Sequence, residues 1–206
     1  MGGLFKEDWE DLTEARNVGS VYLTHLIRGR SDDEAYSTLL DILESGILKA
    51  SFSERNGKRT IRGDKKVVCF QDSSFDLMNE VITGENWCEV GQKYREFGIQ
   101  LDKIILFTLG ARPVIYDRSD DILQLIDESI HWRVVNLDLG SQLQYTDWTH
   151  EREWRIPESV KLSRVPFRII VKSEKYRKML LKEPRAKKAL DDAKKIAVFE
   201  NEISEK

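Results

Sequence analysis

The chain has 206 residues, of which 40% are hydrophobic, and a formal net charge of -3, which predicts one ordinary folded domain and gives no overall indication of nucleic-acid binding. It has only two cysteines, Cys69 and Cys88, which excludes a disulfide framework and a CxxC metal site. No apolar run approaches the roughly 20 residues of a membrane span and no secretory signal is present, so we expect a soluble, cytoplasmic protein without membrane contact.

The first half of the chain predicts alternating helices and strands. In chain order, the segments are a surface helix at 6–17, a strand at 21–26, a helix at 32–45, an extended piece at 47–51, a polar loop at 53–66, a strand at 67–70 and a helix at 73–82. Ser31 is placed to cap the helix at 32–45, and Gly46 is placed to end it. The loop at 53–66 is long enough to act as a functional lid.

The second half continues in the same mixed way. After an apolar run at 104–107, we expect a strand at 113–116, an amphipathic helix at 119–130, a strand at 150–156, a strand at 167–171, helices at 173–182 and 185–194, and a last strand at 196–199. These strands are short and irregularly spaced. The pattern therefore favours an α+β fold with a mixed or antiparallel sheet over a doubly wound parallel sheet.

Charge divides the chain into two parts. Residues 1–158 contain 19 Lys and Arg against 29 Asp and Glu, whereas residues 159–206 contain 14 against 7. We expect 1–158 to form the core and 159–206 to pack on the same domain as a basic strand-helix-helix-strand segment. Its surplus of cations predicts an acidic partner or a phosphate backbone as its contact, or simply a solvated helical face.

The segment Asp147 to Ile156 carries the strongest indication of chemistry. It places two glutamates one residue apart, between two tryptophans and among cations. In an extended strand, Glu151, Glu153 and Arg155 point to one face. A strand face with two carboxylates and an arginine is either exposed to solvent or part of a functional site. The alternative is that the two glutamates form salt bridges with Arg112, Arg152 or Arg155.

Several catalytic motifs are absent from the sequence. No GxGxxG, GxxxxGK[ST], GxSxG or HExxH pattern occurs, and the chain has only three histidines. A multi-histidine zinc site is therefore not expected, and we predict no metal. A Mg²⁺ site made of carboxylates alone stays open, which would make the protein a nuclease using Asp147, Glu151 and Glu153.

The order of several short sequence motifs along residues 20–157 resembles the ADP-ribosyltransferase fold. The pieces are Tyr22-Leu23-Thr24-His25, the helix end Leu43-Glu44-Ser45-Gly46-Ile47-Leu48, Val68-Cys69-Phe70, Tyr94-Arg95-Glu96-Phe97-Gly98-Ile99, Arg112-Pro113-Val114-Ile115-Tyr116 and Trp148 through Arg155. The first two look like DarT-type DNA ADP-ribosyltransferase toxins. The others look more like bacterial proteins related to AbiGi abortive-infection proteins. The resemblance implies a mixed or antiparallel split sheet with flanking helices.

The resemblance also implies how NAD, as substrate, would be held. His25, with Thr24 beside it, would position the nicotinamide ribose or the diphosphate, Tyr94 would stack on a ring, and Arg112 would bind a phosphate. Each of three has a structural alternative. His25 would be a structural histidine whose hydrogen bonds are made within the protein, Tyr94 would be a core aromatic, and Arg112 would lie on an edge strand.

The same resemblance assigns the chemistry to two carboxylates. Glu153 would stabilise the positive charge that develops on the ribose, and Glu151 would orient or deprotonate the acceptor. The middle strand departs from the family pattern, because Cys69 stands where a hydroxyl is expected and Ser73 or Ser74 would have to replace it. The loop at 54–66, with Arg55, Arg59 and Arg62, is a candidate for the arginine-rich substrate element.

The sequence thus predicts ADP-ribosyl transfer from NAD to a nucleic acid or protein, in a bacterial or phage toxin or defence context. The alternative from another class is a non-catalytic module that binds a nucleotide or a protein, with Trp148 and Trp154 at an interface.

Overall fold

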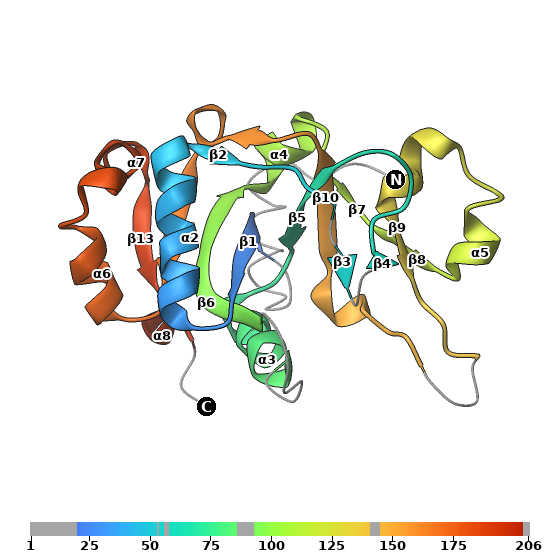
Figure 1. Cartoon of the computed structure of the whole chain (residues 1–206), viewed down its shortest axis with the longest axis horizontal. Helices are drawn as coiled ribbons and strands as arrows, with labels where there is room; N and C mark the ends of the chain where they lie inside the picture. The colour runs from blue at the N-terminus through green and yellow to red at the C-terminus, as the bar shows by residue number, and fades with distance from the viewer. Residues whose placement is uncertain (1–19, 53, 56–57, 86–92, 141–144, 204–206) are drawn as a thin grey trace, which may run out of the picture.

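One mixed sheet organises the structure. The computed structural model describes residues 20–52, 54–55, 58–85, 93–140 and 145–203. The seven strands, in spatial order, are β13 (Lys195–Val198), β12 (Phe167–Val171), β6 (Lys93–Asp102), β1 (Tyr22–Gly29), β5 (Val67–Gln71), β10 (Glu153–Pro157) and β7 (Arg112–Pro113) (Figure 1). β12 and β13 are parallel, whereas the other neighbours are antiparallel. The predicted α+β class with a mixed, mainly antiparallel sheet is confirmed.

The helix α2 (Asp32–Ser45) forms as its local sequence predicts. The hydroxyl oxygen of Ser31 accepts a hydrogen bond from the backbone N–H of Glu34 at 3.2 Å, which satisfies one of the free amides of the first turn. At the other end, Gly46 has a φ of 64°, a left-handed conformation in which glycine has no steric cost. Both predicted caps are therefore present.

The two faces of the sheet are covered differently. α2 lies across one face (Figure 1), where it shares the main hydrophobic core with alternate residues of β1, β6 and β12, among them Leu23, Ile99 and Ile169. On the other face, Met78 and Ile82 of α3 (Phe75–Glu85) pack with Leu26 in a smaller cluster. Because successive side chains point to opposite faces and both faces are covered, β5 and β12 are buried at consecutive positions.

Shorter elements complete the fold. They are β2 (Ile47–Leu48), β3 (Glu54–Arg55), β4 (Lys58–Arg59), α4 (Lys103–Thr108), β8 (Ile115–Asp117), α5 (Ser119–Ile122), η1 (Glu128–Arg133), β9 (Val134–Asn136), η2 (Thr149–Glu151), β11 (Val160–Lys161), η3 (Leu162–Arg164), α6 (Glu174–Leu180), η4 (Pro184–Ala186), α7 (Lys187–Asp192) and α8 (Phe199–Glu202). The pairs β2–β11, β3–β4 and β8–β9 form separate two-stranded sheets.

The segment 159–206 belongs to the same sheet as the rest of the chain. Its strand β12 pairs with β6, and its helices α6 and α7 lie at the left end of Figure 1, beside α2. Within the described ranges, no helix combines the length and the apolar character that a membrane span requires. The expected surface helix at 6–17 lies outside the described residues.

Four predicted elements were wrong in part. The helix expected at 119–130 stops after α5, and the 3-10 helix η1 starts at Glu128, because Asp127 accepts a hydrogen bond from the N–H of Ser129 and caps this new turn. Leu125 is 81% exposed, so this stretch has no core on which to pack an apolar face.

The strand expected at 150–156 begins only at Glu153. Before it, η2 ends in Arg152, whose φ of 44° is left-handed and breaks the alternation of a strand. The strand expected at 113–116 is divided between β7 and β8, and the helix expected at 185–194 is divided between η4 and α7.

Candidate functional site

A cavity of about 600 Å³ lies where β1 and β5 separate. Within the described residues, these strands pair at one position, Thr24 with Gln71, and then diverge. The opening gives the cavity access to residues from both faces of the sheet. Its volume lies in the range of small-molecule and cofactor sites.

The structure brings together most of the predicted site. Thr24, His25, Tyr94, Glu151 and Glu153 all line this one cavity, although they come from β1, β6, η2 and β10. Their separation along the chain means that local sequence did not place them together. The sheet order did.

Glu153 is held by a buried ion pair. The guanidinium of Arg155 donates from Nε to Oε1 at 2.8 Å and from Nη2 to Oε2 at 3.0 Å, while Nη1 donates to the carbonyl oxygens of Trp132 and Val134. Burial opposes the charged form of Arg155, but the charge and hydrogen bonds of Glu153, together with Cys69, favour it, and the pKa of Arg155 is raised. The salt-bridge alternative is thus present in the structure.

A second hydrogen bond fixes the start of β10. The backbone N–H of Glu153 donates to the hydroxyl oxygen of Tyr116 at 2.9 Å. Burial raises the pKa of Tyr116 to about 12, so this hydroxyl is neutral at physiological pH. The main chain and the side chain of Glu153 are both positioned, which is what a preorganised site requires.

Glu151 reaches the cavity by a different route from the one predicted. It ends η2, and the left-handed turn at Arg152 redirects the chain between the two glutamates. Arg152 is held in this turn by donating from Nε to the carbonyl oxygen of Asp72 at 2.8 Å. A non-glycine residue with positive φ costs free energy and is concentrated at functional sites.

His25 is neutral and oriented. Its Nδ1 lies 2.8 Å from the carbonyl oxygen of Cys69, and a carbonyl only accepts, so Nδ1 carries the hydrogen and Nε2 is the acceptor. Burial lowers the pKa of His25, although its bond to Cys69 opposes this shift. Beside it, a side chain at Gly98 would place its Cβ 2.6 Å from the carbonyl oxygen of His25, so only glycine lets β6 approach β1 here.

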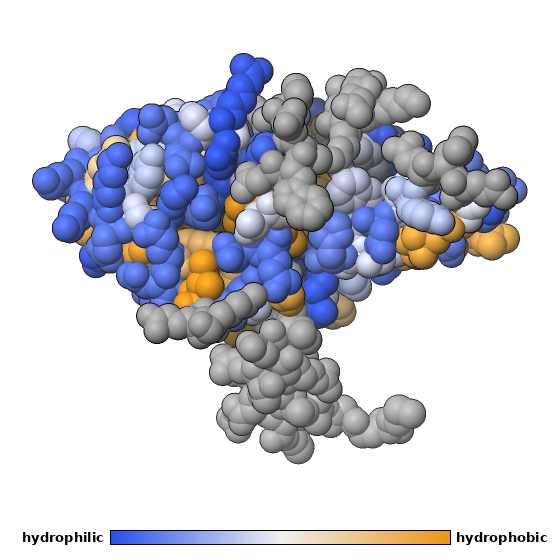
Figure 2. Space-filling model, turned by 90° about the horizontal axis from the view of Figure 1, so that it is seen from below, coloured by the Kyte–Doolittle hydropathy of each residue, from blue (hydrophilic) through white to orange (hydrophobic). Residues whose placement is uncertain are grey.

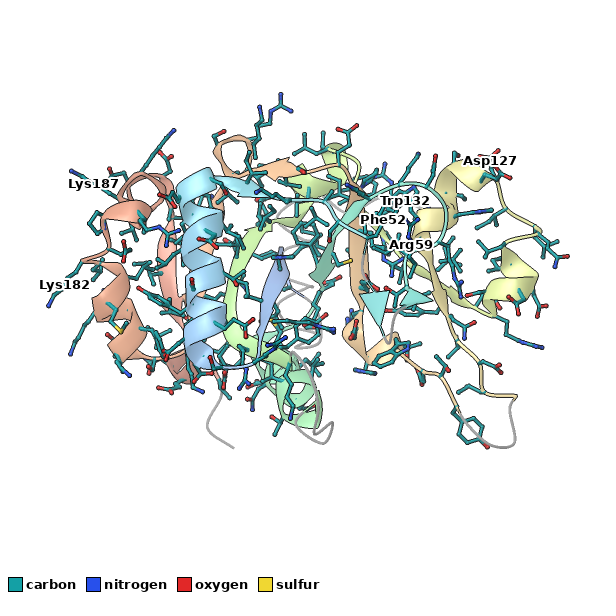
Figure 3. All side chains as sticks on the ribbon, viewed as in Figure 1. Phe52, Arg59, Asp127, Trp132, Lys182 and Lys187 are labelled. Carbon is teal, nitrogen blue, oxygen red and sulfur yellow. The ribbon has the colours of Figure 1, made fainter. Side chains whose placement is uncertain are left out.

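Cations line another part of the cavity. Arg28, Lys49, Arg59 and Arg62 are among the lining residues, and Arg28 stacks 4.0 Å from the ring centroid of Tyr94. The side chains of Arg59 and Phe52 lie close together, with the guanidinium carbon 4.0 Å from the ring centroid (Figure 3). The loop at 54–66 therefore contributes Arg59 and Arg62 to the cavity.

The nearby aromatic and thiol groups are protonated. Burial, followed by the charge of Glu151, raises the pKa of Tyr94 well above its ordinary value. Burial, followed by the charge of Glu153, raises the pKa of Cys69 in the same way. Cys69 is therefore a neutral thiol and a poor nucleophile at physiological pH.

Arg112 is not brought to the cavity. Its Nη1 donates to the carbonyl oxygens of Phe107 and Ala111, both at 2.7 Å, and its guanidinium carbon lies 4.0 Å from the ring centroid of Phe107. This arginine closes the C-terminal end of α4. The serines expected to replace the missing hydroxyl, Ser73 and Ser74, are not among the lining residues either.

The middle strand contributes Gln71 instead. It ends β5, lines the cavity, and stands directly between Thr24 on β1 and Glu153 on β10. The sequence analysis assigned no role to Gln71. The sequence feature that could have indicated a role for Gln71 is its position directly after the apolar run 67–70.

Among the described residues, no group of three or more His, Cys, Asp and Glu side chains is arranged to hold a metal ion. Asp147, a member of the nuclease hypothesis, caps Thr149 through its Oδ1 and does not line the cavity. Comparisons with protein-family models, with curated proteins and with solved structures find no match.

Proposed function

We propose that the protein binds NAD in this cavity and transfers its ADP-ribose to a macromolecule. The observation that carries the proposal is the meeting of His25, Tyr94, Glu151 and Glu153 on one cavity. The resemblance assigned these residues to one NAD site from sequence order alone. A chance assignment would leave most of them apart.

In this reaction, the bond between C1′ of the ribose and the nicotinamide nitrogen breaks, and its electron pair leaves with nicotinamide. An acceptor oxygen or nitrogen bonds to C1′ and gives up its proton. Glu151 is the proposed base for that proton. Glu153, held by Arg155, is the proposed fixed acceptor for a ribose hydroxyl, since a carboxylate with two bonds to Arg keeps further lone pairs.

The lining cations Arg28, Lys49, Arg59 and Arg62, here called the cationic wall, are suited to bind the diphosphate of NAD. Arg59 and Arg62 come from the same loop and line the cavity with Lys49. Arginine binds phosphate oxygens through a planar fork of donors, so these residues suit the bridge between the two nucleosides. Neutral His25 offers Nε2 as an acceptor for a ribose hydroxyl.

A specific observation favours a second candidate, a non-catalytic nucleotide-binding module. The two hydrogen bonds from Arg155 compensate much of the negative charge of Glu153, which weakens its power to stabilise a positive transition state. The same cavity and cationic wall would then bind a dinucleotide without cleaving it.

The deciding experiment compares labelled NAD incubated with wild type, Glu151→Gln and Glu200→Gln, with cell lysate and DNA as acceptors. Glu200 is exposed on α8 and is the matched control. A transferase predicts labelled macromolecule and released nicotinamide with wild type and the control, and roughly a hundredfold loss with Glu151→Gln. Binding of NAD by folded wild-type protein without cleavage would support the module.

We also propose that residues 159–206 contact an acidic partner or a phosphate backbone. Part of the positive charge of this segment forms salt bridges within the protein, since Arg185 pairs with Asp41 and Glu44, and Lys172 pairs with Asp32. Seen from below, the end formed by α6 and α7 is mostly hydrophilic (Figure 2), which suits a polar contact.

The position of this basic end limits the partner. Lys182 and Lys187 project outward there, at the opposite end of the view from Asp127, with Arg59 of the cavity between (Figure 3). A macromolecule that meets both the lysines and the cavity must therefore extend along the protein. Charge reversal at Lys182 and Lys187 should weaken its binding and reduce the dependence of affinity on salt.

A further inference from the structure

An unpartnered amide lies in the wall of the cavity. Gln71 is only 4% exposed, and neither Nε2 nor Oε1 of its side chain has a hydrogen-bond partner within the described part of the chain. Buried polar groups are nearly always bonded, so an unpaired donor and an unpaired acceptor together point to a group supplied from outside the chain.

The position of Gln71 indicates where that group lies. In the antiparallel sheet, Gln71 pairs with Glu153 on one side and Thr24 on the other, so the three side chains share one face. Directly opposite residues have Cβ atoms roughly 5 Å apart. The hydroxyl oxygen of Thr24 already accepts from Nε2 of Gln100 at 3.2 Å. The missing partner is therefore expected in the cavity, which Gln71 lines next to its strand neighbour Glu153.

We propose that Gln71 recognises the primary carboxamide of the nicotinamide ring. Its Nε2 would donate to the carboxamide oxygen, and its Oε1 would accept from the carboxamide NH₂, so both unpaired atoms would be satisfied by one group. The inference rests on the proposed NAD site. It selects the nicotinamide over the adenine because the bond that breaks is on the nicotinamide ring, beside Glu153, whereas the adenine lies at the far end of the dinucleotide.

This role separates stability from selectivity. Replacing Gln71 by Leu removes a buried polar group that has no partner in the unliganded protein, so the melting temperature should hold or rise. Selectivity for the carboxamide should fall at the same time. A residue with only a structural role would not combine these two effects.

The experiment measures binding, not turnover, by calorimetric titration of each folded variant. The probes are NAD and 3-acetylpyridine adenine dinucleotide, a neutral analogue in which a methyl group replaces the NH₂. Wild type should prefer NAD by roughly tenfold or more, and Gln71→Leu should bind the two within about twofold, because the NH₂ loses its acceptor. The control is Gln124→Leu, which replaces an exposed glutamine that does not line the cavity.

The outcomes separate this inference from the proposed function. If wild type binds NAD but Gln71→Leu keeps the wild-type preference, the inference is wrong and the NAD site stands. The inference is also wrong if Gln71→Leu instead alters the preference for adenine over hypoxanthine in the other base. If folded wild type binds no dinucleotide, the proposed function fails and the inference fails with it. Loss of preference in Gln71→Leu but not in Gln124→Leu supports the inference.

Discussion

The ion pair between Glu153 and Arg155 predicts a stability effect that must be separated from any catalytic effect. In Glu153→Gln, the guanidinium of Arg155, only 3% exposed, keeps its two backbone acceptors but loses the opposite charge. Removing one partner of a buried pair costs roughly 3–5 kcal/mol, and glutamine keeps one acceptor, so we expect about 3 kcal/mol. For 206 residues, this lowers the melting temperature by about 7 °C.

The measurement is thermal unfolding of wild type, Glu153→Gln, Arg155→Met and the double variant Glu153→Leu/Arg155→Met. The double variant should lose less than the sum of the single effects, by at least about 1 kcal/mol, because it leaves no unpaired charge. The carbonyl oxygens of Trp132 and Val134 still lose their donor, so stability should not return fully. An unchanged melting temperature in Glu153→Gln would refute the reasoning.

Three further predictions concern neighbouring positions. Burial lowers the pKa of His25 below its ordinary 6.5, so between the two values the unfolded chain binds more protons than the folded protein, and the free energy of unfolding should fall as the pH drops from about 6.5. In urea unfolding, His25→Asn should flatten this pH dependence. The control His150→Asn, at an exposed position, should affect it less. Gly98→Ala should destabilise the protein by more than about 1 kcal/mol, since its Cβ would meet a strand backbone at 2.6 Å, and an unaltered urea midpoint would contradict this. Arg112→Gln should cost about 1 kcal/mol through its lost hydrogen bonds yet leave NAD affinity unchanged, so a tenfold affinity loss by titration would return this residue to the site.

Most regular elements could be predicted because their causes are local. The caps of α2 need only Ser31 and Gly46 at the right spacing, and each acts within a few residues. The strands β1, β5 and β12 are visible as runs of apolar and β-branched residues. The α+β class follows from the order and spacing of these segments.

Elements whose stability depends on distant partners were predicted poorly. The sequence at 119–130 has a helical apolar pattern, but Leu125 finds no core, so propensity alone does not extend the helix. At Arg152, a hydrogen bond to the carbonyl oxygen of Asp72 holds a turn in a segment with the composition of a strand. Asp72 lies 80 residues from Arg152 in the sequence, so local reasoning could not find this hydrogen bond.

The candidate site shows the same division. The sequence by itself determined which residues carry charge and hydrogen-bonding groups, and their order along the chain singled out Thr24, His25, Tyr94, Glu151 and Glu153. Only the tertiary structure decided that these side chains meet, that Arg112 lies elsewhere, and that Gln71 and Arg155 join them. The physical reason is that a cavity wall is set by strand order and register, which depend on burial across the whole sheet.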